Sequence, residues 1–340
     1  MIRKSFGLGA FLIASSLVFA CGSSSTRDAF SDGAGNGNGS SGTGSSSSGD
    51  SLGDNPPPAE PPQPEECEKM DIVFVVDDSG SMKEEQANLA ANFPKFIAKI
   101  DSFKTKGGSK LDWRIAVTTT GRDIAYTITP PAIPGFPSVP AVPQSEKGDN
   151  GEFRMGGKCG TSKRWIEKAD ATAAKDFQCL AQVGTSGPSI EMPLESVKLA
   201  LDDRMSDGTN AGFLRDDALL AVVVLSDEDD CSRTDNNFTI QNDVCKTMDG
   251  VKPVADYKQM LDAVAKGAGR WATAVIAGPT ACKSSFGDAS EAARLQEFVS
   301  LAGKNGTFSS ICDGDLSNAL EKALDTFDAA CKVFPPSEVK

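Results

Sequence analysis

Residues 71–82, which read DIVFVVDDSGSM, decide the expected fold of this chain. The first six form an apolar, β-branched run of the kind expected for a strand that is buried on both faces. The run ends in DDSGS, a turn rich in carboxylate and hydroxyl oxygens, and a helical segment begins near Met82. A strand, an oxygen-rich turn and a helix in this order place a site at the carboxyl edge of an open α/β sheet.

The spacing of the turn residues points to a metal ion. Asp77, Ser79 and Ser81 stand two residues apart, and their oxygens suit a hard divalent cation such as Mg²⁺ or Mn²⁺. Asp-x-Ser-x-Ser after a buried strand resembles the metal-ion-dependent adhesion site of von Willebrand factor type A domains. The same residues also occur in turns and helix caps without any metal. A second buried strand, ending at Asp227, makes that plain structural interpretation the weaker one.

The resemblance extends over residues 67–331, where strands and helices alternate without an internal repeat. This order predicts one doubly wound α/β domain, von Willebrand type A-like or Rossmann-like, with a mostly parallel central sheet flanked by helices. Residues 123–129 could fold back as a short antiparallel partner of the strand 113–119. The proline-rich residues 130–150 show no periodic apolar pattern and are expected to form a surface loop. The main strands are expected at 71–76, 113–119, 219–225, 271–277 and 306–311, and the main helices at 84–103, 171–182, 189–201, 253–266, 290–302 and 315–331.

The resemblance also implies two further ligands from later loops. The matching positions are Thr185, ahead of a helix, and Asp227, at the end of the strand 219–225. Thr118, Thr119 and Thr120 are rivals for the role of Thr185. Two carboxylates would neutralise the ion, and hydroxyls would add neutral ligands, which leaves one position for a partner's carboxylate. Mg²⁺ is the expected ion, with Mn²⁺ or Ca²⁺ as alternatives.

Composition excludes several functions. The 340 residues carry a net charge of −13, so the chain lacks the basic excess that nucleic-acid binding requires. The absence of histidine removes Ser-His-Asp and Cys-His catalysis and histidine-ligated zinc. Residues 75–79 begin like a haloacid-dehalogenase motif, but Ser79 stands where that chemistry needs a second Asp. Residues 78–80 match an aspartic-protease motif that occurs only once. We therefore expect no catalytic residue and no enzyme.

The N-terminus has the pattern of an export signal. Arg3 and Lys4 precede an apolar stretch, residues 8–20, that is too short to span a membrane comfortably. Residues 18–21 (VFAC) resemble a bacterial lipobox, which predicts lipid on Cys21; ordinary secretion is the alternative. A Gly/Ser-rich and then Pro-rich stretch follows and is expected to form a disordered tether. The expected division is a signal peptide (1–20), a linker (21–66), the type A-like domain (67–331) and a tail (332–340).

The remaining eight cysteines form an even set, which in an exported chain favours four disulfides. No pair has the Cys-x-x-Cys spacing of zinc or redox sites. Many pairings are possible. If the ends of the domain lie close together, a bridge between the outermost pair would close the fold, and three local pairs would complete the set: Cys67–Cys331, Cys159–Cys179, Cys231–Cys245 and Cys282–Cys312.

Together these features predict a lipid-anchored protein of the cell envelope, in the outer membrane and facing either the periplasm or the surface. Its type A-like domain is expected to bind a protein partner through the metal, and to contact the membrane only through the lipid. One alternative is a structural envelope protein stabilised by disulfides, and a remote one is a metal-assisted phosphohydrolase. A separate calcium site in the acidic run 227–230, near Asp235, Asn236 and Asn237, is a further possibility, although no EF-hand spacing is present.

Overall fold

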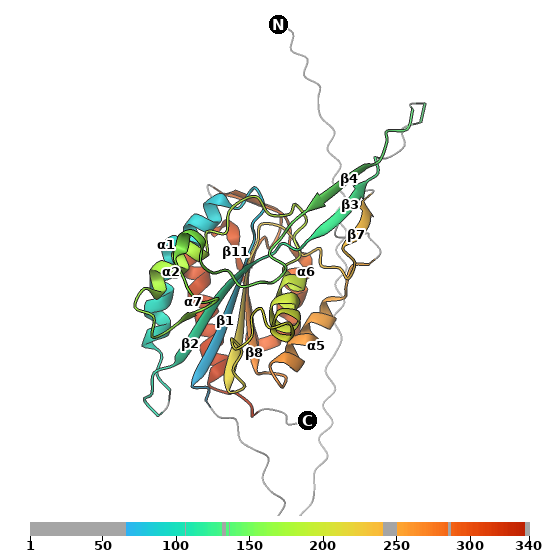
Figure 1. The fold of residues 1–340 in the computed structure, drawn as a ribbon. Coiled ribbons are helices and arrows are strands. Elements are labelled where there is room, and N and C mark those ends of the chain that lie inside the picture. The colour runs from blue at the N-terminus through green and yellow to red at the C-terminus, as the bar shows by residue number, and fades with distance from the viewer. Residues whose placement is uncertain are drawn as a thin grey trace, which may run out of the picture. The chain divides into compact units, whose positions relative to one another are not determined.

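The computed structural model describes residues 66–105, 107–130, 134–135, 137–240, 250–284 and 287–336. Its central sheet has six strands in the order β11, β8, β6, β1, β2, β5 (Figure 1). The first five are parallel to their neighbours, and only the short β5 is antiparallel. The predicted doubly wound, mostly parallel fold is thus confirmed. The strands are β1 (Lys69–Val76), β2 (Asp112–Thr119), β5 (Ile166–Glu167), β6 (Ala218–Leu225), β8 (Trp271–Ala277) and β11 (Gly306–Ser310).

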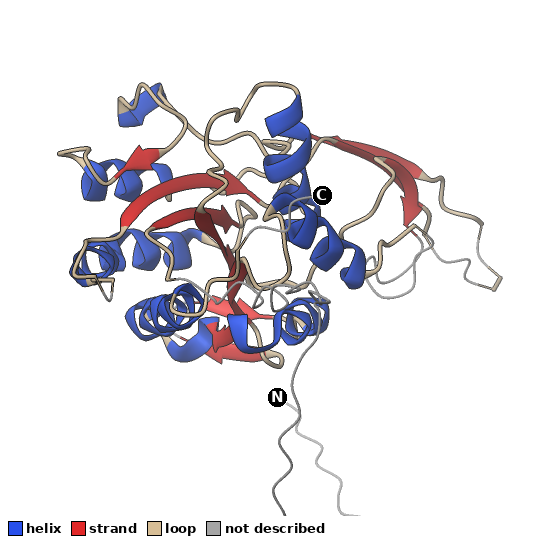
Figure 2. Cartoon of the chain, turned by 90° about the horizontal axis from the view of Figure 1, so that it is seen from below, coloured by secondary structure: helices blue, strands red, loops and turns tan. Residues whose placement is uncertain are grey.

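Helices cover both faces of this sheet (Figure 2). One face packs against α1 (Lys83–Ser102), α2 (Ala173–Leu180) and α7 (Leu316–Cys331). The other packs against α3 (Pro193–Lys198), α5 (Val254–Val264) and α6 (Ala293–Ala302). Side chains of β1 alternate between the two layers, with Phe74 in the first and Val75 in the second. This double burial explains why the strand is an unbroken apolar run rather than an alternating one.

One helix differs from its expected bounds, and another contains a proline. α1 is continuous from Lys83 to Ser102 and has Pro94 inside it. The helix expected from residue 189 begins only at Pro193, a residue that favours the first turn because its ring fixes φ and it has no N–H to satisfy. Residues 189–192 are therefore not helical. After α3 the chain continues through a π-helical turn (Leu199–Asp203) into α4 (Arg204–Ser206).

A second sheet contains β4 (Val142–Glu146), β3 (Ile124–Ile128) and β7 (Asn237–Ile240), in that order. β3 does not pair with β2, as was expected of residues 123–129; it pairs with β4 and β7. Its antiparallel partner β4 lies in the stretch expected to be a loop, so that expectation was also wrong. The reason is that strand pairing, not an alternating apolar pattern, defines β4, whose side chains are mostly exposed. A small apolar cluster at the base of this sheet includes Ile124, Tyr126, Ile190, Met192 and Phe238.

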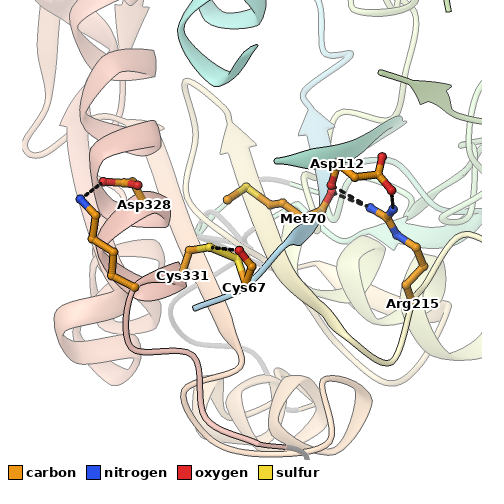
Figure 3. The surroundings of a disulfide bond; sticks show 7 residues. Cys67, Met70, Asp112, Arg215, Asp328 and Cys331 are labelled. Atoms are coloured by element: carbon orange, nitrogen blue, oxygen red, sulfur yellow. Dashed lines mark hydrogen bonds and ion pairs between the residues drawn. A yellow bond between two sulfur atoms is a disulfide. The ribbon is translucent and has the colours of Figure 1, made fainter. Parts of the chain in front are cut away.

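Three disulfides staple the domain, and they join pairs expected from the sequence. Cys67–Cys331 links the start of β1 to the end of α7 (Figure 3). Cys159–Cys179 and Cys282–Cys312 close local loops, the latter fixing a hairpin of β9 (Cys282–Ser284) and β10 (Gly287–Ala289). Cys231 is also disulfide-bonded. Its expected partner Cys245, like Cys21 and the whole signal and linker region before Glu66, lies outside the described residues. No helix in the described ranges is long and apolar enough to cross a membrane.

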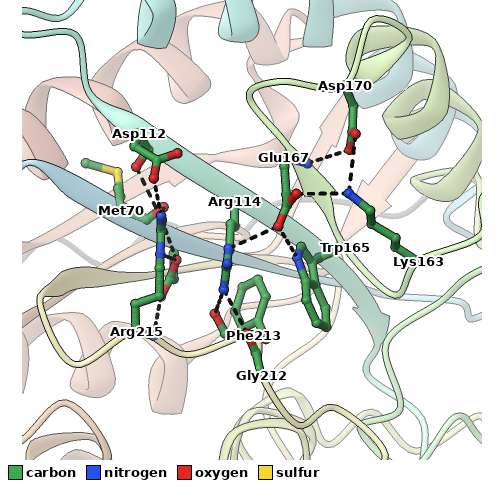
Figure 4. A network of polar contacts seen from close by, with 11 residues as sticks. Met70, Asp112, Arg114, Lys163, Trp165, Glu167, Asp170, Gly212, Phe213 and Arg215 are labelled. Carbon is green, nitrogen blue, oxygen red and sulfur yellow. Dashed lines mark hydrogen bonds and ion pairs between the residues drawn. The ribbon is translucent and has the colours of Figure 1, made fainter.

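At the amino edge of the sheet, a buried acid is paired with the base Arg215, whose contacts with Met70 and Asp112 are drawn in Figure 4. Asp71 of β1 is only 1% exposed. Arg215 donates from its backbone N to Asp71 Oδ2 and from Nε to Asp71 Oδ1, each at 2.8 Å. Its guanidinium also reaches Asp112. Burial raises the pKa of Asp71, and the hydrogen bonds and charge of Arg215 oppose that rise.

Candidate metal centre

The turns after β1 and β6 meet at the carboxyl edge of the sheet because the two strands are in register, Val76 beside Leu225. Asp77, directly after β1, is fully buried. Its Oδ1 accepts a hydrogen bond from the backbone N of Ser79 at 2.8 Å, and its Oδ2 accepts one from Ser226 Oγ at 2.6 Å. The first carboxylate is therefore held in one orientation from both sides.

Three more predicted ligands join Asp77 in one cluster. The hydroxyl oxygens of Ser79 and Ser81 lie 3.3 Å apart. The Ser81 hydroxyl in turn faces the carboxylate of Asp227. Asp227 is 3% exposed, and its Oδ1 is a buried acceptor without a hydrogen-bond partner in the described structure. Hydroxyl and carboxylate oxygens from two distant parts of the chain thus converge, as the sequence motif predicts.

Thr185 lies in a loop that the structure ties to the same motif. Gln86 of α1 donates from Nε2 to the carbonyl oxygens of Asp77, at 2.7 Å, and of Gly184, at 2.8 Å. Gly187 donates to the carbonyl oxygen of Asp78 at 2.8 Å, and a Cβ on Gly187 would lie 2.2 Å from Asp78 Cγ. The loop that contains Thr185 can therefore approach the Asp78 side chain this closely only because residue 187 is glycine. The Thr185 side chain itself is exposed and, among the described residues, makes no hydrogen bond to the cluster.

The rival threonines lie at the carboxyl end of β2 and just beyond it. Thr118, Thr119 and Thr120 are all buried. The Thr119 hydroxyl bonds to Asp78 rather than to the Asp77 cluster. The Thr118 hydroxyl has no partner in the described structure. The choice between Thr185 and these rivals therefore remains a prediction.

Glu191 is a member of this region that the sequence interpretation missed. It is 1% exposed, and neither carboxylate oxygen has a hydrogen-bond donor among the described residues. The charge of Asp77 acts on this carboxyl, which also lies against that of Glu228. The residue was overlooked because 189–201 was expected to be helical throughout. The sequence did contain one indication of its role: Glu191 is a single acid between two apolar residues, Ile190 and Met192, and it stands two positions before Pro193, where α3 starts.

The electrostatics of this edge are those of buried acids without bases. Burial raises the pKa of Asp77, and the charge of Asp227 raises it further, while hydrogen bonds from Ser226 and Ser79 oppose both effects. Burial also raises the pKa of Glu191 and of Asp227. It raises the pKa of Glu85, on α1, to about 7. Within the described ranges, no Lys or Arg forms an ion pair with any of these four carboxylates.

The rest of the acidic run after β6 has structural partners. Asp229 accepts hydrogen bonds from the backbone N of Arg294 at 3.0 and 3.1 Å, at the start of α6. Asp230 accepts from the Arg294 side chain at 3.0 Å and from the backbone N of Leu194 in α3 at 3.0 Å. These carboxylates position two helices, so they offer few free oxygens for a separate calcium site.

No group of three or more His, Cys, Asp or Glu side chains in the described part of the chain is arranged to hold a metal ion. A metal here would thus need the serine or threonine hydroxyls as ligands. A pocket of about 500 Å³ opens beside Ser81 and Asp227. Its wall is the β9–β10 hairpin, where Lys283 pairs with Asp288. The cluster is therefore accessible from one side.

No protein-family model matches the chain, and no curated protein is similar enough to count as a match. Among solved structures, proximal thread matrix protein 1 from the mussel byssus aligns with 77% of this chain and 49% of its own, at 14% identity and a TM-score of 0.40. The pilus adhesin SpaC of Lactobacillus rhamnosus GG aligns with 78% of this chain and 31% of its own, at 10% identity and a TM-score of 0.38. Manganese-loaded TRAP protein of Plasmodium vivax covers 76% and 74%, at 10% identity and a TM-score of 0.32. These likenesses are too distant to assign a function.

Proposed function

We propose that this chain is a cell-envelope lipoprotein whose α/β domain binds a protein partner through a divalent cation. The ion would be held by Asp77, Ser79, Ser81, Thr185 and Asp227, with Mg²⁺ as the expected species. In this proposal the domain is a binding module of von Willebrand type A character and not an enzyme. Cys21 would carry the lipid, and the residues up to 66 would tether the domain to the membrane.

One observation carries the proposal: buried carboxylates meet at the carboxyl edge, and no Lys or Arg among the described residues forms an ion pair with them. Asp77 is fully buried, and Asp227 keeps a buried oxygen that lacks a hydrogen-bond partner in the described structure. Burying an ionised carboxylate without a partner is costly, so such groups pair, bind a metal or take up a proton. A divalent ion between Asp77 and Asp227 would neutralise both charges and occupy the unpartnered oxygen.

The donor set fits a hard cation. Carboxylate and hydroxyl oxygens are the ligands that Mg²⁺, Mn²⁺ and Ca²⁺ prefer. When bound, the ion would supply a Lewis-acidic position for a partner's carboxylate. The residues of the chain would orient the ligands: Ser226 and the backbone N of Ser79 fix Asp77, and Gln86 holds the Thr185 loop beside it. The pocket beside Ser81 would admit the partner's side chain.

Calorimetric titration of Mg²⁺, Mn²⁺ and Ca²⁺ into the full chain tests the metal site. We expect one-site binding that is lost in Asp77→Ala and Asp227→Ala. The matched control is Asp207→Ala, which removes an exposed acid that pairs with Arg204 far along the chain. Thr185→Ala and Thr118→Ala, measured in parallel, would decide which threonine is a ligand.

Partner binding requires a second readout. Once a partner is captured, its retention should vanish with EDTA and with Asp77→Ala, while the far-ultraviolet circular dichroism stays unchanged. Binding that persists in EDTA, together with no metal binding at millimolar concentration, would contradict the proposal and favour a structural envelope protein. Metal binding that survives both aspartate substitutions would place the ion elsewhere.

A further inference from the structure

The segment 137–143, which reads PSVPAVP, combines a regular spacing with full exposure. Its prolines stand three residues apart, at Pro137, Pro140 and Pro143. Between them come a small residue and then a bulky apolar one, Ser138-Val139 and Ala141-Val142. In the sequence the same pattern continues back to Pro131, as PAIPGF. We call residues 137–143 the proline segment.

The proline segment lies on an arm of the molecule. The strands β3 and β4 project away from the central sheet, and the segment leads into and begins β4 (Figure 1). All seven residues are exposed, Val139 by 60% and Val142 by 44%. Ile128, which pairs with Val142 across the hairpin, is 39% exposed. Half of the large exposed apolar side chains of the described structure are therefore gathered here: Ile128, Val139 and Val142, against Met155, Leu301 and Val333 elsewhere.

A period of three residues has a specific physical meaning. A polyproline II helix has three residues per turn, so this spacing would place the prolines along one face, the valines along a second and the small residues along the third. Such a helix is preformed and loses little entropy on binding, which is why proteins recognise it in grooves lined by aromatic side chains. A period of two or 3.6 would instead indicate a strand or an α-helix.

We propose that the proline segment is a docking surface for a partner protein that binds polyproline II helices in an uncharged groove lined by aromatic side chains. Charge supports this choice of partner. The chain has a net charge of −13, yet residues 124–145 contain no charged side chain. A groove that matches residues 124–145 needs an apolar and aromatic surface, and basic side chains in it would add no attraction.

Two other occupants fit the segment less well. A second copy of the chain would pair along the free edge of β4, but Pro140 and Pro143 lack the N–H groups that edge pairing uses. A lipid bilayer would accept the exposed valines, but insertion into lipid gives no reason for a spacing of three residues.

The base of the arm is rigid enough to present the segment. Tyr126 of β3 donates to Glu146 of β4 at 3.0 Å, and Ser189 donates to the same carboxylate from Oγ at 2.9 Å. Residues of the apolar cluster around Tyr126 and Phe238 pack beneath these bonds. A partner bound to the arm would thus be held in a defined orientation relative to the domain. The inference does not depend on a metal.

The test uses competition between two synthetic peptides. Envelope extract of the source cells is passed over the immobilised full chain in EDTA, so that failure of the metal proposal cannot affect the result. The column is then eluted with a peptide of residues 131–143, or with an isomer of identical composition whose prolines are moved off the three-residue spacing. We expect release of a bound protein by the first peptide only, and at least about tenfold weaker retention on Val139→Ser/Val142→Ser. Retention should be unchanged on the control Met155→Ser/Leu301→Ser, which removes exposed apolar side chains elsewhere.

Four outcomes would overturn the proposal. Two concern the column: both peptides release the bound protein alike, or the first peptide releases no protein. In the third, the chain binds phosphatidylethanolamine–phosphatidylglycerol vesicles, and Val139→Ser/Val142→Ser abolishes that binding. In the fourth, sedimentation velocity shows a dimer, and the same variant abolishes it. Because β4 contains Val142, the variant's unfolding midpoint is measured first. Insertion of one alanine after Pro140, which shifts the spacing but keeps every side chain, is the second variant and should also lose retention.

Discussion

The two ends of β1 bury the same kind of group in opposite ways. Asp71, near the amino end, is 1% exposed and is gripped by Arg215 through three contacts between 2.7 and 2.8 Å. Asp77, just past the carboxyl end, is fully buried, and within the described ranges its carboxylate accepts hydrogen bonds from the Ser226 hydroxyl and the backbone N of Ser79. The charged neighbour that raises its pKa is another acid, Asp227.

This difference separates a charge that is balanced within the chain from acids that are not. At the amino edge the chain supplies its own cation, Arg215. At the carboxyl edge neutral donors hold Asp77 in place. Under the proposed function, a divalent cation from outside the chain would balance the charge there.

The largest effect is expected from the covalent closure of the amino edge. Replacing both Cys67 and Cys331 by alanine should lower the free energy of unfolding by up to about 5 kcal/mol, since this bridge has a sequence separation of 264. The pair Cys159 and Cys179, with a separation of 20, should cost about 3 kcal/mol. Denaturant unfolding of the two double variants measures the difference, and equal losses would contradict the loop-length argument.

The next effect concerns the ion pair. Arg215→Met should lower the free energy of unfolding by about 3 kcal/mol because it leaves Asp71 buried without a cation. Adding Asp71→Asn should recover part of the loss. Arg204→Met removes the ion pair of a half-buried arginine with the exposed Asp207 and should change the unfolding midpoint little. If Arg215→Met behaves like this control, Asp71 is not charged in the folded chain and the contrast between the edges fails.

The comparison predicts opposite signs for two matched substitutions. In EDTA, Asp77→Asn should raise the free energy of unfolding by about 1 kcal/mol, because it removes a buried charge that has no base. Asp71→Asn should lower it by a similar amount, because Arg215 loses its partner. Glu191→Gln should act in the direction of Asp77→Asn. The three unfolding curves are then repeated with Mg²⁺, which should stabilise the parent chain but not Asp77→Asn. Destabilisation by all three substitutions in EDTA would mean that both edges are already balanced.

The sequence predicts one of these edges far better than the other. The apolar runs of β1 and β6 and the turn residues after them locate Asp77 and Asp227, because the ends of adjacent parallel strands lie together. No local pattern links Asp71 to Arg215, which are brought together by packing across a separation of 144 residues. Glu191 was missed for a related reason: residues 189–192 were expected to be helical, but α3 begins only at Pro193.

The arm was hidden by the kind of pattern sought. A search for periods of two and 3.6 residues finds nothing in 130–150, and β4 has exposed side chains that leave no alternating signal. The spacing of three residues between successive prolines is visible in the sequence itself. Its significance emerged only with the structure, which exposes the segment on a pair of strands instead of burying it.

The smallest effect is the pH dependence of the metal-free chain. Burial raises the pKa of Glu85 from 4.5 to about 7 and that of Asp78 from 3.8 to about 6. Between these ordinary pKa values and pH 7, the folded chain binds more protons at Glu85 and Asp78 than the unfolded chain does. Stability contributed by these groups is therefore greatest below their ordinary pKa values of 4.5 and 3.8, and it is lost as the pH rises through about 6 to 7. The decline should lower the unfolding midpoint by on the order of 2–4 °C. Glu85→Gln should make it smaller.

Saturating Mg²⁺ should oppose the same decline, because the ion binds ionised carboxylates and competes with protons for them. The midpoints are measured at intervals from pH 5 to pH 8, in EDTA and in Mg²⁺, for the parent chain and Glu85→Gln. Glu85 is not a proposed ligand, so its substitution should leave the Mg²⁺ effect in place while reducing the slope in EDTA. A metal-free chain that becomes more stable between pH 5 and pH 7 would show that the carboxyl edge already carries its charges without cost, and the distinction between the two ends of β1 would disappear.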